Sequence, residues 1–380
     1  MSFKKKTKKI LLVMSDLEIG GTEKHILSII PLLLKEQILV CICAMNGSGA
    51  LLEKYENSGA ELVVNDIFCK SDRKTWRFLN FFKVILNDFF GLCCLLKALI
   101  SFRPTIVHFF LPRPYILGGS LSLLFPVKKI MSRRSMNNYQ DKYFWLPAFE
   151  KYLHKKMDLI TANSNYIYRQ LLLENIPSEK LVLIYNGIKT NPSFPIESNR
   201  PLENKLDIIC VANLIGYKGH SDLFHALALL SPEFDWTLMC VGRDGGQKKS
   251  LVELAEQLGI FEKITFTGAV QNPSPYLNEA SIGINCSHEE GLPNAVLEYM
   301  AHGLAIIVTD VGGNAELIRH KVDGLVVESR NPLQLMEAIQ SMSILSERYS
   351  FSQSAKKRVE KYFSLTKCGE SYAKMYNSLS

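Results

Sequence analysis

The sequence predicts an α/β protein with two doubly wound domains, each a parallel sheet covered by helices on both faces. The chain has 380 residues, more than the roughly 250–300 that one hydrophobic core usually serves. Short apolar runs alternate with longer amphipathic stretches, which is typical of βαβ units. Residues are 47% hydrophobic and 21% charged, which excludes a disordered, collagen-like or coiled-coil chain.

Predicted strands are apolar runs without polar alternation, as strands buried on both faces should be. In the first half these runs are 10–15, 38–44, 61–64, 105–110, 129–132, 159–162 and 181–185. In the second half they are 206–212, 236–241, 264–267, 282–285 and 305–309.

The run 186–205 is rich in proline and poor in apolar residues, which predicts a linker at 191–205. We therefore expect an N-terminal domain at 1–190 and a C-terminal domain at 206–365. Residues 366–380 should form a helix that packs back towards the N-terminal domain. Two such domains facing each other place a ligand in the cleft, at the carboxyl ends of their strands.

Charge is distributed unevenly along the chain. Residues 1–190 carry 27 Lys and Arg against 15 Asp and Glu, a net of +12, whereas residues 191–380 carry 17 against 22, a net of −5. The basic half should therefore meet an anionic surface or ligand. Nucleic acid is disfavoured because the basic residues form no known recognition motif, and we expect an acidic lipid surface instead.

The cysteines and the apolar runs indicate a cytoplasmic protein. The nine cysteines form no Cys-x-x-Cys pair and most lie in apolar runs, as buried free thiols do in a reducing compartment. The longest uninterrupted apolar run, 89–96, is shorter than the roughly 18 residues of a spanning helix. The apolar stretch 10–14 behind the N-terminal lysines is too short for a signal peptide.

Glycine-containing loops follow several predicted strands and precede helices. Gly20-Gly21, Gly242 and Gly312-Gly313 all have this placement, which leaves backbone N–H groups available for a phosphate. Neither G-x-G-x-x-G nor G-x-x-x-x-G-K-[ST] occurs, which disfavours a dinucleotide dehydrogenase or a P-loop NTPase. Lys218 lies at another strand-to-helix corner, where a mobile cation suits a diphosphate.

The segment 285–302 contains two carboxylates on either side of a helix start. Glu290 lies in the loop before the helix, and Glu298 follows almost two turns into a helix that should begin near Leu292. One carboxylate can reach the sugar end of a ligand, and the other a second hydroxylated ring. Backbone N–H groups of Asn294 and Ala295 would point at phosphates between them.

This order of motifs resembles the retaining glycosyltransferases of family four (glycosyl transferases group 1), which have the GT-B fold of two Rossmann-like domains. The resemblance extends over nearly the whole chain. It rests on Glu290-Gly291-Leu292-Pro293-Asn294 through Glu298 as the family's E-x7-E element, Lys218-Gly219, Val241-Gly242, Gly312-Gly313 with Glu316, Asn186-Gly187-Ile188 and Gly20-Gly21-Thr22-Glu23.

The resemblance implies a donor site for a nucleotide-diphosphate sugar, with Glu290 and Lys218 as the catalytic residues. Glu290 would contact the donor hexose and Glu298 the ribose, while Lys218 and helix N-termini would stabilise the leaving diphosphate without a metal or cofactor. The implied donor-binding residues are Gly20, Gly21, Asn213, Lys218, Gly242, Arg243, Glu290, Gly291, Asn294, Ala295 and Glu298.

Two departures from the family pattern concern charged residues. Asn213 stands where many members have an arginine, and Arg243 could compensate for the missing charge. Many members also have a histidine near residue 132, where this chain reads Ser-Arg-Arg-Ser. We predict that Arg133 or Arg134 replaces it on the acceptor side, together with His108 at the end of a strand.

Segment 70–103 combines basic residues with many aromatic and aliphatic ones, a composition suited to the headgroup region of an anionic membrane. We therefore predict a retaining, metal-independent hexosyltransferase on the inner face of the plasma membrane. We expect it to transfer a hexose or N-acetylhexosamine to a lipid-linked glycan during capsule, O-antigen or exopolysaccharide assembly. The alternatives are a non-catalytic nucleotide-sugar or glycan-binding subunit, and a GT-B phosphorylase or epimerase.

Overall fold

A computed structural model describes residues 8–47, 49–65, 77–137, 140, 143–190 and 205–379, with side chains in the range 77–83 excepted. The chain forms two compact units, Met1–Tyr185 with Thr366–Ser380, and Asn186–Leu365. The division thus falls at residue 185, and residues 366–380 belong to the N-terminal unit. Apart from Lys205, the predicted linker lies outside the described residues. A ligand cleft between the domains stays a prediction.

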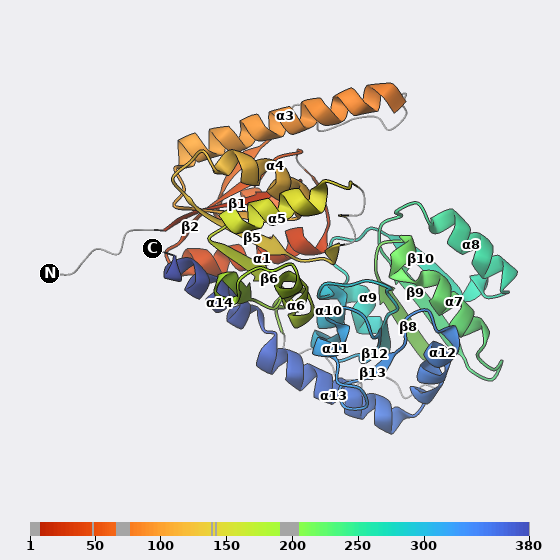
Figure 1. Ribbon diagram of the computed structural model, residues 1–380. Helices are drawn as coiled ribbons and strands as arrows, with labels where there is room; N and C mark the ends of the chain where they lie inside the picture. The colour runs from red at the N-terminus through yellow and green to blue at the C-terminus, as the bar shows by residue number, and fades with distance from the viewer. Residues whose placement is uncertain are drawn as a thin grey trace. The chain divides into compact units, whose positions relative to one another are not determined.

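The N-terminal unit is built on a seven-stranded sheet of order β3-β2-β1-β4-β5-β6-β7, and all of its strand pairs are parallel (Figure 1). Its strands are β1 (Lys9–Met14), β2 (Leu39–Ala44), β3 (Glu61–Val64), β4 (Ile106–Phe110), β5 (Lys128–Arg133), β6 (Leu159–Ala162) and β7 (Leu181–Leu183). Its helices are α1 (Gly21–Lys35), α2 (Leu52–Glu56), α3 (Arg77–Phe102), α4 (Pro112–Ser122), α5 (Leu146–Lys156), α6 (Asn165–Leu173) and α14 (Leu365–Ser378).

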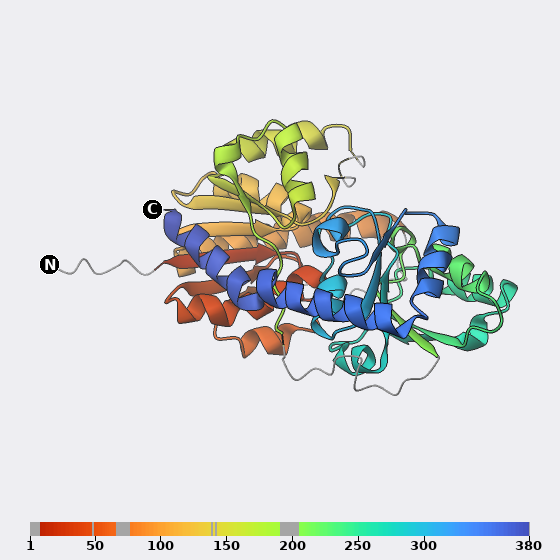
Figure 2. The same ribbon diagram turned by 90° about the horizontal axis from the view of Figure 1, so that it is seen from below.

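Helices cover both faces of this sheet (Figures 1 and 2). On one face, α14 packs on α1 so closely that a Cβ on Gly369 would lie 2.4 Å from the Leu32 side chain. On the other face, α4 lies beside α3, since a Cβ on Gly118 would lie 2.7 Å from Leu95. The sheet is therefore buried between two helical layers, as its apolar strands predict.

The C-terminal unit has a six-stranded parallel sheet of order β10-β9-β8-β11-β12-β13. Its strands are β8 (Leu206–Val211), β9 (Trp236–Val241), β10 (Ile264–Gly268), β11 (Ile282–Asn285), β12 (Ala305–Thr309) and β13 (Leu325–Val327). Its helices are α7 (His220–Ala228), α8 (Lys248–Gln257), α9 (Ser274–Glu279), α10 (Asn294–Ala301), α11 (Asn314–Leu317), α12 (Pro332–Ser341) and α13 (Leu345–Tyr362).

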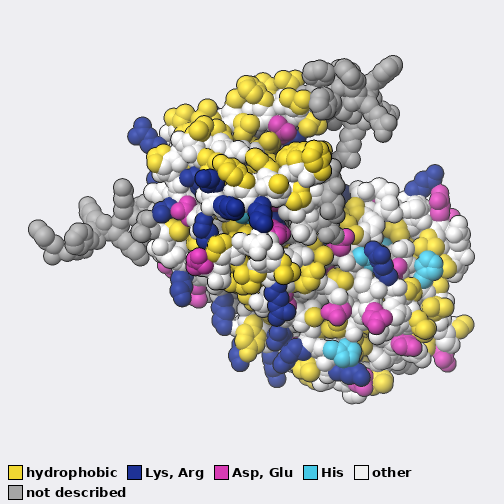
Figure 3. Space-filling model, in the orientation of Figure 1, with side chains coloured by type: hydrophobic (Ala, Val, Ile, Leu, Met, Phe, Trp, Pro, Cys, Tyr) yellow, Lys and Arg dark blue, Asp and Glu magenta, His cyan; other side chains and the backbone are white. Residues whose placement is uncertain are grey.

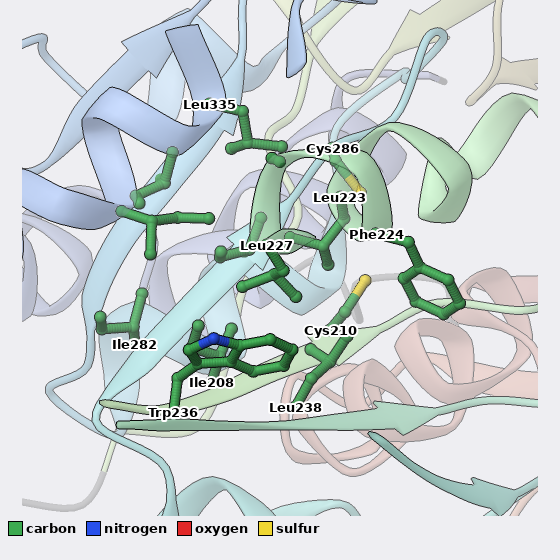
Figure 4. Close-up of a cluster of buried hydrophobic side chains, with 14 of the residues drawn as sticks. Ile208, Cys210, Leu223, Phe224, Leu227, Trp236, Leu238, Ile282, Cys286 and Leu335 are labelled. Carbon is green, nitrogen blue, oxygen red and sulfur yellow. The ribbon is translucent and has the colours of Figure 1, made fainter. Parts of the chain in front are cut away.

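Apolar side chains from the sheet and from α7 and α12 form the core of the C-terminal unit (Figure 4). Trp236 of β9 lies at the base of this cluster and Leu223 and Phe224 of α7 cover it, all at most 3% exposed. The fold class predicted from the sequence is confirmed: two parallel-sheet α/β domains. One strand, β13, was not expected, because three residues after Gly324 are too short a run to identify.

Each sheet reverses its strand order at one place, between β1 and β4 in the first unit and between β8 and β11 in the second. The loops that leave these neighbouring strands turn to opposite sides, and open α/β sheets bind ligands there. Gly20-Gly21 follows β1, Lys218 follows β8 and Glu290 follows β11. The fold therefore brings the predicted motifs of each unit to its own switch point.

One helix bears on the expectation that no segment spans a membrane. Within α3, the stretch Val84–Phe102 is long and apolar enough to cross a membrane by length and composition alone, and 28% of it is buried inside the protein. Asp88 and Lys97 interrupt the strictly apolar run, as expected from the sequence. The inner side of α3, including Leu95 and Leu99, packs in the core of the N-terminal unit.

Candidate active site

Lys218 and Glu290 form an ion pair in the C-terminal unit. Lys218 ends the 3-10 turn Gly216–Lys218 after β8, and Glu290 lies in the loop after β11. The lysine Nζ is 2.6 Å from Glu290 Oε1, with the two side chains 18% and 9% exposed. Burial alone would lower the pKa of Lys218, but the Glu290 carboxylate outweighs it and raises that pKa. Lys218 is therefore a fixed cation at the switch point.

Glu290 is held by neutral donors as well as by the lysine. Its Oε1 accepts hydrogen bonds from Ser287 Oγ at 2.7 Å and Asn285 Nδ2 at 3.2 Å. The Asn285 amide is oriented in turn, because its Oδ1 accepts from Asn314 Nδ2 at 3.2 Å. Asn314 also donates to the Thr309 carbonyl at 2.9 Å. The ends of β11 and β12 and the start of α11 thus fix one carboxylate oxygen.

The Gly312-Gly313 loop packs against the backbone of Glu290 and Gly291. Gly312 has a φ of +54°, and a Cβ there would lie 1.9 Å from the Glu290 carbonyl oxygen. The Gly313 N–H donates to the Gly291 carbonyl at 2.9 Å. Gly312 is therefore required for the close packing of the two loops, and the Gly313 N–H is occupied by a protein carbonyl.

Helix α10 begins at Asn294, with Pro293 as its N-cap. Glu298 therefore lies just over one turn into the helix, not almost two turns as expected. Asn294 Oδ1 accepts a hydrogen bond from Asn186 Nδ2 at 2.7 Å, which anchors the start of α10. The N–H groups of its first turn have no carbonyl acceptor within the helix, so Asn294 and Ala295 stay candidates for phosphate binding.

Strands β8 and β11 pair over only two residues each, and past this pairing the hydroxyl of Tyr299 from α10 lies between them. Its hydroxyl accepts from the Val211 N–H at 2.7 Å and donates to the Ile284 carbonyl at 3.3 Å. Its ring covers Gly283, where a Cβ would lie 2.4 Å from the ring carbon Cγ. The separation at the switch point is thus built by one tyrosine and one glycine.

The predicted charge compensation involves the loop after β9. Asn213 Oδ1 accepts the backbone N–H of Arg243 at 3.1 Å. Gly242 is necessary between these strand ends, because a Cβ there would lie 2.0 Å from the Ala212 carbonyl oxygen. Asn213 thus orders the turn that presents Arg243, whose side chain is exposed. A diphosphate contact by Arg243 stays a prediction.

The N-terminal unit contains Gly20 and Gly21 at the start of α1, with Gly20 as the N-cap. A Cβ on Gly20 would lie 2.1 Å from the Glu23 Oε2 atom, so the carboxylate of Glu23 folds back over this glycine. The helix start therefore already has an acidic neighbour of its own, and diphosphate binding by Gly20 and Gly21 remains a prediction.

The prediction that His108 lies on the acceptor side is wrong, because the side chain is buried and cannot reach an acceptor. His108 is fully buried, with Nδ1 2.7 Å from Tyr376 Oη and Nε2 2.8 Å from Ser132 Oγ. Burial and the charge of Arg134 hold the pKa of His108 well below its usual value. A neutral ring with both nitrogens engaged joins β4, β5 and α14, so it serves the fold.

Arg133 likewise cannot face an acceptor. Its guanidinium is 1% exposed and pairs with Glu150 at 3.1 Å, and also with Glu174. The same group lies 3.1 Å from His154 Nε2. This buried network packs α5 and α6 against β5. Arg134, the next residue, is half-buried and remains the acceptor-side candidate.

Sequence reasoning missed a second titratable pair beside the Lys218–Glu290 pair. His288 Nε2 lies 2.7 Å from Asp222 Oδ2, which joins the loop after β11 to the first turn of α7. The signal was present, because His288 lies within the motif itself. In the part of the chain that the structure describes, no three His, Cys, Asp or Glu side chains gather as metal ligands do. Metal independence remains a prediction.

Gly219 connects Lys218 to α7, and its replacement is the first test of this geometry. Gly219 has a φ of +71°, and a Cβ there would lie 1.9 Å from the Cys286 carbonyl oxygen. Gly246 also has a positive φ, +101°, but nothing lies within 4 Å of its Cβ position. We expect Gly219→Ala to reduce the free energy of unfolding by about 1 kcal/mol or more beyond the effect of Gly246→Ala. Urea denaturation of both variants measures this, and equal losses would contradict the close packing.

Comparison with known proteins gives consistent family matches for the two halves. Residues 19–192 match the model described as Glycosyltransferase Family 4, and residues 205–343 match that of Glycosyl transferases group 1. An uncharacterized glycosyltransferase of Haemophilus influenzae is 33% identical over 153 residues, which cover 39% of this chain and 43% of that protein.

A second relative, from Campylobacter jejuni, is named N-acetylgalactosamine-N,N'-diacetylbacillosaminyl-diphospho-undecaprenol 4-alpha-N-acetylgalactosaminyltransferase. It is 30% identical over 193 residues, or 50% of this chain and 52% of that enzyme. The matches thus span about half the length of these curated relatives. Among solved structures, HepE of Anabaena in complex with UDP-glucose has a TM-score of 0.80 at 18% identity, covering 97% of this chain and 99% of HepE. At this identity the likeness concerns the fold.

Proposed function

Because the chain belongs to the group 1 glycosyltransferases and has their GT-B fold, we propose that it transfers a hexose or N-acetylhexosamine from a nucleotide-diphosphate sugar to a glycan, with retention of configuration. The observation that carries this proposal is the Lys218–Glu290 pair at the β8–β11 switch point. A fixed cation beside a fixed carboxylate supplies one group for the diphosphate and one for sugar hydroxyls.

The proposed reaction needs charge stabilisation, not a protein nucleophile. As the anomeric C–O bond breaks, its electron pair moves to the diphosphate. The acceptor hydroxyl attacks the oxocarbenium-like sugar from the same face, and its proton passes to the oxygen of the departing diphosphate. Lys218 and the N–H groups of Asn294 and Ala295 stabilise the negative charge on the leaving group. Glu290 orients the sugar while Ser287 and Asn285 continue to hold its Oε1.

We propose a lipid-linked glycan as the acceptor and surface polysaccharide assembly as the process, with the protein on the cytoplasmic face of the membrane. The name of the Campylobacter relative, which includes diphospho-undecaprenol, supports such an acceptor. The net charge of +12 on residues 1–190 supports an anionic membrane surface as a partner. The alternative is a non-catalytic subunit that binds a nucleotide sugar. It is suggested by Asn213, which stands where many family members have an arginine, so that one positive charge is missing.

A thermal-shift screen of nucleotides and nucleotide sugars tests donor binding. A ligand at 100 times its dissociation constant adds about 2.7 kcal/mol to the free energy of unfolding, so the correct donor should raise the melting temperature clearly. The same donor, incubated with the protein, should release its nucleoside diphosphate. Binding without release would support the non-catalytic alternative, and no shift with any nucleotide sugar would contradict the proposal.

A further inference from the structure

Helix α3 of the N-terminal unit is apolar on its outer side as well as on its inner side. A helix that faces water normally has a polar outer side. The outward side chains that are 37% to 59% exposed are those of Val84, Ile85, Leu86, Phe89, Leu96 and Ile100, and the thiol-bearing Cys93, expected to be buried, is exposed among them. Contiguous apolar patches of this kind mark interaction sites.

An aromatic group at the start of α5 extends this apolar surface. Tyr143, Phe144 and Trp145 are 56%, 98% and 46% exposed, and Leu124, after α4, is 79% exposed. The rings of Tyr143 and Trp145 lie 5.7 Å apart, so they form a group without covering Phe144. Tyrosine and tryptophan have an apolar body with a polar edge and favour the boundary between lipid and water.

Helix α4 joins these two regions into one layer. A Cβ on Gly118 of α4 would lie 2.7 Å from Leu95 of α3, and one on Gly119 would lie 3.8 Å from Leu153 of α5. Gly118 thus lets α4 lie close to α3, and Gly119 on α4 is within van der Waals range of α5. Figure 3 shows hydrophobic side chains over α3 and dark-blue Lys and Arg side chains beside α4 and α5. We call this layer the α3–α5 face.

The charge of the α3–α5 face is positive. The acidic residues of its described helical segments are Asp88, paired with Arg113 at 2.7 Å, and Glu150, buried against Arg133. Besides Arg113, the basic side chains exposed on the same helices are those of Lys97, Lys151, Lys155 and Lys156. An apolar surface with exposed aromatic residues and an excess of lysine is the composition of a surface that binds anionic lipid.

We propose that the α3–α5 face binds an anionic bilayer, with Phe144 and the outer side of α3 inserted at the headgroup boundary. A second copy of this chain is a poorer occupant, because a symmetric contact would bring the lysines of two α5 helices together. Insertion of α3 as a span is also disfavoured, since its inner side packs in the core. This proposal rests on the membrane partner proposed above and names the surface that binds it. It does not depend on the glycosyl transfer reaction.

Flotation of the full chain with vesicles tests this surface. One set of vesicles is phosphatidylcholine alone, and the other is phosphatidylcholine and phosphatidylglycerol in equal parts. We expect binding to the acidic vesicles only, and about tenfold weaker binding for the double variant Phe144→Ser with Trp145→Ser. Lys155→Gln with Lys156→Gln should reduce binding by a similar factor, and salt should reduce it further.

Matched variants of the C-terminal unit serve as controls. Leu229→Ser removes an apolar side chain that is 56% exposed, and Lys248→Gln with Lys249→Gln removes two neighbouring exposed lysines of α8. Both should bind vesicles like the parent chain. Unchanged flotation of the Phe144→Ser and Trp145→Ser double variant would overturn the proposal, as would equal binding of the parent chain to neutral vesicles. A dimer of the parent chain that becomes a monomer in the Ile100→Ser variant would also overturn it, because a second copy would then cover this face. Donor hydrolysis, measured without vesicles, should be the same for all these variants and reports separately on the proposed reaction.

Discussion

Replacing Glu290 by Gln is expected to lower turnover at least tenfold, which corresponds to ~1.4 kcal/mol of activation free energy. Glutamine has the same shape, and its carbonyl oxygen can still accept from Ser287, Asn285 and Lys218 as Glu290 Oε1 does. The fold should therefore survive. The variant loses the negative charge that orients Lys218 and that would accept hydrogen bonds from the sugar hydroxyls. Turnover of the nucleotide sugar should therefore fall.

The pH dependence of Glu290→Gln gives a second readout. In the parent chain the Glu290 carboxylate raises the pKa of Lys218 against the opposing effect of burial. Without that charge, burial prevails and the pKa of Lys218 falls. The lysine then loses its proton at a lower pH, so the alkaline limb of the activity profile should move to lower pH in the variant.

Glu289→Gln is the matched control, because Glu289 is adjacent, carries the same charge and is partly exposed. It should leave turnover and the pH profile as in the parent chain. If Glu290→Gln has the same activity as the parent, Glu290 does not belong to the active site. If both variants lose activity equally, a general loss of negative charge near the switch point is the cause.

Most strands could be predicted because a strand buried on both faces must be a continuous apolar run. The run 282–285, for example, coincides with β11, and 236–241 with β9. Helix boundaries were harder to place, because they depend on single backbone angles. Pro293 has a ψ of 118°, which makes it the N-cap of α10 and shifts Glu298 back by half a turn. A proline suits either position, so the sequence leaves this open.

Within the site, the ion pair is formed by two motif residues, but its supporting amides carry no periodic signal. Asn285 and Asn314 are neighbours only because β11 and β12 are adjacent in the sheet. Tertiary context also decides between Arg133 and Arg134, since the partners of Arg133 are 17 and 41 residues away. For His108 the decisive partner, Tyr376, is 268 residues away. The only local indication of a structural role is that this histidine lies within an apolar strand.

Lys218→Met should lower turnover by about a hundredfold, or ~2.7 kcal/mol of activation free energy. Methionine keeps the length of the side chain and removes the cation that would stabilise the leaving diphosphate. Glu290 retains Ser287 and Asn285 as hydrogen-bond donors, so the loop should remain folded. Because charge on the diphosphate grows as the anomeric bond breaks, kcat should fall more than KM rises. Steady-state kinetics of donor hydrolysis separate the two.

The control for Lys218→Met is Lys249→Met, whose side chain is 91% exposed and lies 3.8 Å from Glu253 on the same helix. Its turnover should be unchanged. If Lys218→Met also remains within twofold of the parent and Arg243→Gln is strongly impaired, the diphosphate charge is met by the loop after β9 instead.

Combining Lys218→Met with Glu290→Gln tests whether the ion pair acts as a unit. Two independent groups would give losses that multiply, whereas partners in direct contact give losses that do not. Since Nζ and Oε1 are 2.6 Å apart, the double variant should be scarcely worse than Lys218→Met alone. A fully multiplicative loss would mean that the two side chains act on the substrate independently and that their mutual contact contributes little to catalysis.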